Sequence, residues 1–60
     1  MRYEVWYEPN EKGKKAMVEA SRVGGPYAGR VYAKFVAQME WRDTPEERKP
    51  YGKFIIREVE

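Results

Sequence analysis

The sequence predicts a small, β-rich fold: an antiparallel sheet of about four strands in meander order, curled toward a barrel. Apolar and polar residues alternate along several segments, as they do in strands that bury one face. Leucine is absent, whereas the chain has two Trp, five Tyr and two Phe, and aromatic residues favour strands. These observations leave open an α+β alternative, a ββαβ chain in which residues 26–42 are helical.

Residues 2–8, RYEVWYE, form the clearest predicted strand, because two tyrosines and a valine fall on one face. Pro9 then ends the strand with a turn. Residues 15–23, KAMVEASRV, also fit a short helix. We favour a second strand there, paired with the first, because consecutive strands are usually neighbours.

Residues 24–29, GGPYAG, are predicted to reverse the chain, because Gly tolerates positive φ and Pro is common in turns. The next segment, residues 30–41, reads RVYAKFVAQMEW and fits both periods. On a strand, Tyr32 would stand on a solvent face between two basic residues. On a helix, it would join an apolar arc. We favour the strand, because Trp41 would fall on the polar side of the helix.

The remaining residues are predicted to form a short helical turn and a last strand. Thr44 and Pro45 suit the cap and first position of a helix, and Pro50 limits that helix to about one turn. Residues 53–60, KFIIREVE, are rich in β-branched residues and predict the last strand.

A chain of 60 residues is expected to fold as one domain, residues 1–60. It has no Cys and no His, so neither a disulfide nor a zinc site braces the core. No segment approaches the about 20 apolar residues that span a bilayer, and no signal peptide is apparent, so we expect a soluble, cytoplasmic protein without membrane contact. The high charge content, with a single Asn and a single Gln, is typical of proteins from hot environments.

The sequence does not indicate catalysis. The commonest catalytic groups at neutral pH, His and Cys, are missing, and no carboxylates have the spacing of a metal-binding loop. Helix capping explains the carboxylates of Asp43, Glu46 and Glu47. We therefore expect a protein that is not an enzyme and that uses no cofactor, metal or small-molecule substrate.

The net charge of +2 hides a basic block in the middle of the chain. Between Lys12 and Lys34, six basic residues stand against Glu19 alone. Cations neutralise phosphates and aromatic rings stack on bases, so the block predicts largely sequence-independent binding of DNA or RNA. The predicted contacts are Lys12, Lys14, Lys15, Arg22, Arg30, Tyr32 and Lys34. Further stacking candidates are Trp6 and Tyr27.

In size, basic central charge, aromatic content and lack of Cys and His, the chain resembles the small chromatin proteins of heat-loving archaea. The resemblance implies a compact, β-rich domain that coats DNA with little sequence preference; it rests on composition and assigns no residue a role. The alternative is a small protein-binding regulator or inhibitor, for example one encoded by a virus. Its aromatic-rich surface would bind a protein partner, because Tyr, Trp and Arg are common interface anchors.

Overall fold

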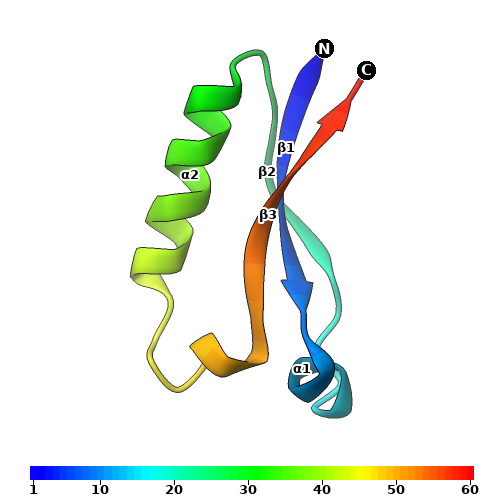
Figure 1. Cartoon of the computed structure of the whole chain (residues 1–60), viewed down its shortest axis with the longest axis vertical. Helices are drawn as coiled ribbons and strands as arrows, with labels where there is room; N and C mark the ends of the chain where they lie inside the picture. The colour runs from blue at the N-terminus through cyan, green and yellow to red at the C-terminus, as the bar shows by residue number, and fades with distance from the viewer.

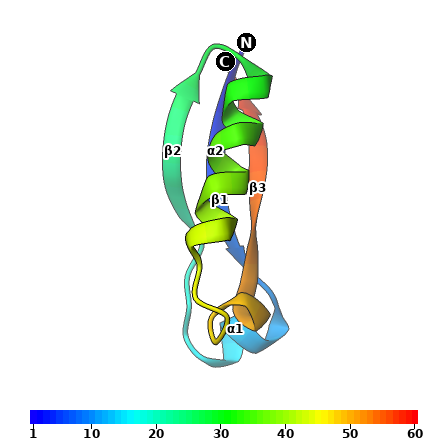
Figure 2. The same ribbon diagram turned by 90° about the vertical axis from the view of Figure 1, so that its left-hand side faces the viewer.

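The computed structural model describes all residues, 1–60, and shows an α+β fold. Three antiparallel strands form one sheet in the order β2-β1-β3, and helix α2 packs on one face, running along the strands (Figure 1, Figure 2). The elements are β1 (Arg2–Pro9), α1 (Glu11–Lys15), β2 (Ser21–Tyr27), α2 (Arg30–Asp43), the 3-10 turn η1 (Lys49–Tyr51) and β3 (Gly52–Val59). The predicted four-stranded meander is wrong, and the α+β alternative is compatible with the structure.

Strands β1 and β3 confirm the strands predicted for residues 2–8 and 53–60. They pair along their whole length without a shift in register. The register sets Val5 beside Ile56 and Tyr7 beside Phe54, on the face that α2 covers. The Tyr7 and Phe54 rings meet edge to face with their centroids 5.3 Å apart. This face of the sheet is therefore the apolar one, and the other face is open.

The second strand begins later than residue 15. Helix α1 precedes it, because Asn10 caps a helical turn: the Asn10 side chain accepts a hydrogen bond from the Gly13 N–H at 2.9 Å. The reversal predicted for residues 24–29 is also misplaced, because the first four of these residues lie in β2. The pairing with β1 shifts beside Gly24, and Gly25 has a φ of 102°, so the chain bends within the strand.

The strand predicted for residues 30–41 is wrong, because α2 covers all of them. The helix begins at Arg30 and not at residue 26, since residues 26 and 27 still belong to β2. Its buried stripe centres on Ala33, which is fully buried, with Val36 and Ala37 half-buried. Small residues let the helix approach the sheet closely.

The apolar arc expected of a helix in this segment faces solvent. Val31 is 84% exposed, Tyr32 56% and Phe35 55%. Among apolar residues, only Val5 and Ala33 are fully buried. The core is therefore small, and a strip of apolar side chains remains uncovered on the outside of α2.

Thr44 ends α2 and does not cap the short helical turn predicted after it, because that turn, η1, begins at Lys49. The Thr44 N–H donates to the Trp41 carbonyl at 3.2 Å, and its hydroxyl donates to the Glu40 carbonyl at 2.7 Å. The cap residue predicted from sequence therefore satisfies carbonyls at the C-terminus of the preceding helix. No helix in the chain is long and apolar enough to cross a membrane.

Candidate nucleic-acid interface

The predicted binding residues lie in separate places, and the structure does not bring them into one surface. Lys12, Lys14 and Lys15 lie on α1, at the end of the molecule far from the chain termini (Figure 1). Arg22 and Trp6 share the open face of the sheet, whereas Arg30 and Lys34 lie on the flank of α2 above β3. Tyr27 and Tyr32 pack against each other where α2 meets β2.

Tyr32 does not stand between Arg30 and Lys34. Residues two apart on a helix are separated by about 200° around its axis, so these side chains leave α2 on different sides. Tyr32 instead meets Tyr27 edge to face, with ring centroids 4.9 Å apart. The predicted arrangement of one ring between two cations is therefore absent at this position.

That arrangement occurs instead around Trp6, on the open face of the sheet. The Trp6 indole N–H donates to Glu4 Oε1 at 2.9 Å, and Arg22 donates to Glu4 Oε2 at 3.0 Å. Across the ring, the guanidinium carbon of Arg57 lies 4.5 Å from the ring centroid, a cation–π contact. The carboxylate fixes the indole, and arginines from both edge strands, β2 and β3, flank it.

Sequence reasoning missed Arg57, together with Arg2 and Lys53 on the same face. The alternation of residues 53–60 puts Lys53 and Arg57 on one side of a strand. No local pattern, however, shows that this strand pairs with β1, because the two are far apart in sequence. Only the observed register, with Arg57 opposite Glu4, brings Arg57 to Trp6.

Two hydrogen bonds hold the pKa of the Glu4 carboxyl below its ordinary value of 4.5. The first cause is the bond from Trp6, and the second is the bond from Arg22. Both stabilise the charged form. Glu4 therefore remains a carboxylate that neutralises part of the charge of Arg22 and orients the ring.

Acid is expected to release Trp6. Because the pKa of Glu4 is lower in the folded than in the unfolded chain, its stabilising contribution is complete above pH 4.5 and disappears as the pH falls through the folded value. In an NMR titration, the indole N–H resonance of Trp6 should shift with a midpoint below 4.5, and Arg22→Ala should raise that midpoint. The indole of Trp41, which donates to no carboxylate, is the internal control. A Trp6 midpoint at or above 4.5 would contradict the assignment.

A second basic surface is the groove between α2 and β3. Its cations are Arg30 and Lys34, its polar and aromatic groups include Gln38 and Trp41, and no carboxylate lines it; Lys53 borders it at the edge of β3. The predicted cations Arg30 and Lys34 are thus close together, but the ring that accompanies them is Trp41. This groove lies beside the free edge of β3.

The lysines of α1 form a weaker candidate. Lys12 lies over the Tyr51 ring, with Nζ 5.1 Å from the centroid, while Lys14 and Lys15 are exposed. They lie at the end of the molecule beyond the sheet. Their position on α1 does not bring them next to Trp6.

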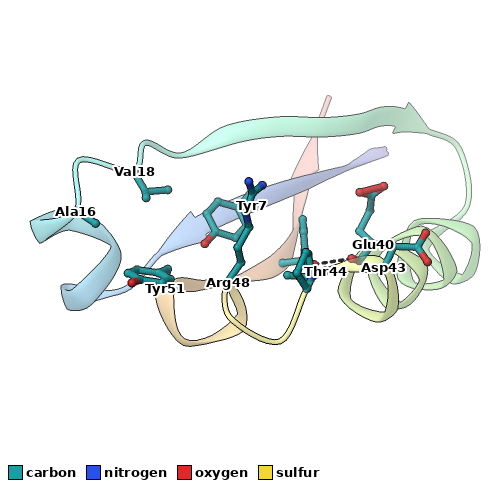
Figure 3. A pocket seen from close by; sticks show the side chains of 10 residues that line it. Tyr7, Ala16, Val18, Glu40, Asp43, Thr44, Arg48 and Tyr51 are labelled. Atoms are coloured by element: carbon teal, nitrogen blue, oxygen red, sulfur yellow. Dashed lines mark hydrogen bonds between the residues drawn. The ribbon is translucent and has the colours of Figure 1, made fainter.

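A hollow of about 540 Å³ opens between α1, η1 and the C-terminal end of α2 (Figure 3). Tyr7 and Arg48 lie in its middle, with Ala16 and Val18 on one side and Glu40 on the other (Figure 3). Every buried polar side-chain atom in the chain has a hydrogen-bond partner, so no buried unpaired group marks the hollow as a site.

Nowhere in the chain do three or more carboxylates gather to form a group that would hold a metal ion. Comparison with protein-family models, with curated proteins and with solved structures gives no match for this chain.

Proposed function

We propose that this protein binds nucleic acid, single strands above all, through the open face of its sheet. The observation that supports the proposal is the cation–π contact of Arg57 with the Trp6 ring, whose indole N–H is bonded to Glu4, the partner of Arg22. A guanidinium plane and an indole ring both offer a stacking surface to any base. Binding by stacking requires no particular sequence.

The charges around Trp6 suit a phosphate backbone. Arg2, Lys53 and Arg57 are exposed, and Arg22 is half-exposed even in its pair with Glu4. The Glu4 carboxylate is already bonded, so it repels phosphate less than a free one would. A strand crossing the sheet would place a base on Arg57 and its phosphates among the surrounding cations.

The test is a titration of labelled oligothymidine, with double-stranded DNA and single-stranded RNA in parallel, followed by fluorescence anisotropy. Arg57→Ala should weaken binding by about 5- to 150-fold, the loss of one stacked base. The matched control is Arg42→Ala, because Arg42 is exposed on α2 and not on the sheet; its affinity should stay at the wild-type value. With about three phosphates contacted, log K should fall with log salt at a slope of about −2.

Two outcomes would count against the proposal. Absence of binding at about 50 mM salt would reject nucleic acid as the partner. Binding that survives Arg57→Ala but disappears when Lys12, Lys14 and Lys15 are replaced by alanine would move the site to α1. Circular dichroism spectra of each variant exclude loss of the fold as the cause.

A second candidate function is protein binding, and the outer face of α2 favours it. Val31, Tyr32, Phe35 and Met39 are all more than a third exposed and lie on one side of the helix. A contiguous exposed apolar strip is typical of protein-binding surfaces. This candidate becomes the leading one if the titrations show no binding of DNA or RNA.

A further inference from the structure

The outer edge of β3 is free, and one contact shows which of its backbone groups point outward. The Asn10 N–H donates to the Tyr51 carbonyl at 3.0 Å, one step beyond the end of the β1–β3 ladder. In an antiparallel ladder, hydrogen-bonded and non-hydrogen-bonded pairs alternate. The residues whose N–H and C=O groups point away from β1 are therefore Gly52, Phe54, Ile56 and Glu58.

The two edges of the sheet differ in their protection. The pairing of β2 with β1 is shifted at two places, and β2 contains Pro26, which has no N–H to donate. β3 contains no proline and pairs with β1 through all 8 residues without a shift. A long, regular edge is a template for another strand, so β3 is the edge that is open to pairing.

We infer that two copies of this chain pair through their β3 edges, antiparallel, to form one continuous sheet around a two-fold axis at Ile56. In this register Ile56 lies opposite Ile56 of the second copy. Phe54 lies opposite Glu58 of the second copy, and Ile55 lies opposite Arg57 of the second copy. No like charges face each other. An axis at Ile55 would instead set Lys53 opposite Arg57, and directly opposed like charges destabilise a sheet. A two-fold contact of this kind closes on itself and gives a dimer.

The charge of the α2–β3 groove fits a second copy. Arg30 and Lys34 of α2 line the groove, Lys53 borders it at the edge of β3, and no carboxylate lines it. Glu58 shares the α2 face of the sheet with its pair partner Tyr3. The axis at Ile56 therefore brings Glu58 of the second copy to the groove, with Glu60 continuing along it. The paired strand supplies the negative charge that the groove lacks.

The small core gives a further reason for pairing. Among apolar residues, only Val5 and Ala33 are fully buried, and small domains without disulfides often gain stability by oligomerising. Pairing at β3 would cover Phe54 and Ile56, which are half-buried in the single chain. It would leave the open face with Trp6 free, so this inference does not depend on nucleic-acid binding.

The test compares Glu58→Pro with Glu58→Ala in sedimentation and light-scattering measurements over a range of concentrations. The wild type should reach twice the 7.2 kDa mass of one chain. Proline removes the outward N–H, which is unused within the chain, whereas alanine keeps it and removes only the carboxylate. The proline variant should dimerise about tenfold or more weakly than the alanine variant, because the two-fold axis removes two hydrogen bonds at once.

Amide hydrogen exchange locates the contact. The amides of Phe54, Ile56 and Glu58 should become protected as the wild-type concentration rises, while the outward amide of Arg22 on β2 continues to exchange fast. A chain that remains monomeric at every concentration would overturn the inference. Equal dimerisation of the two Glu58 variants, with both folded by circular dichroism, would overturn it as well.

Discussion

Replacing Val5 with alanine is expected to lower the free energy of unfolding by about 2 to 3 kcal/mol. Val5 lies in the middle of the central strand, and its side chain is fully buried beneath α2. Two lost methylene equivalents account for about 1.6 kcal/mol, and the cavity adds the rest. A chain of this length has a total stability of about 3 to 9 kcal/mol, so the loss is a large part of it.

Val31→Ala is the matched control, because the same atoms are removed from a side chain that is 84% exposed. Its effect should stay within about 0.5 kcal/mol. Urea unfolding of both variants, followed by circular dichroism, measures the difference. An equal loss at Val31 would show that the outer face of α2 is buried in solution, either by a different helix orientation or by association.

The contrast between buried Val5 and exposed Val31 leads to the reason why the sequence predicted β1 and β3 but not α2. In β1 the apolar residues alternate, and β3 is rich in β-branched residues, so both segments favour a strand. In residues 30–41, a strand face and a helical arc both collect the large apolar side chains, so neither pattern excludes the other. The structure buries Ala33 fully and Val36 and Ala37 in part, and it exposes the large side chains of Val31, Tyr32 and Phe35. Which apolar residues of the helix meet the sheet depends on how closely the helix must approach it, and a local sequence pattern does not contain that distance.

The candidate site was predicted only in part, for a related reason. The sequence identified Trp6 and Arg22 as candidates, but grouped Arg22 with the basic block and not with the ring. Their contact depends on Glu4, which holds both, and on Arg57, which comes from the far end of the chain. Strand order and register are properties of the whole sheet, so residues that meet across it are not visible as neighbours in the sequence.

Gly13→Ala is expected to destabilise the fold by about 1 to 3 kcal/mol, the opposite of the usual effect in a helix. Alanine normally stabilises a helix by up to about 1 kcal/mol over glycine. Here, a Cβ would collide with the Tyr51 carbonyl oxygen and lie 2.9 Å from the Pro9 Cβ. The same carbonyl accepts the Asn10 N–H at 3.0 Å, so moving α1 away to relieve the collision would break that bond as well.

The control is Gly29→Ala, because a Cβ at Gly29 has no heavy atom within 4 Å and the residue's φ of −105° suits alanine. Gly29 caps α2, where alanine is a poorer cap than glycine, but alanine also restricts the unfolded chain. These effects oppose each other, so the net change should stay within about 0.5 kcal/mol. Thermal and urea unfolding of both variants give the comparison. A gain in stability at Gly13 would mean that α1 stands clear of Tyr51 and that the contact between α1 and η1 does not support the fold.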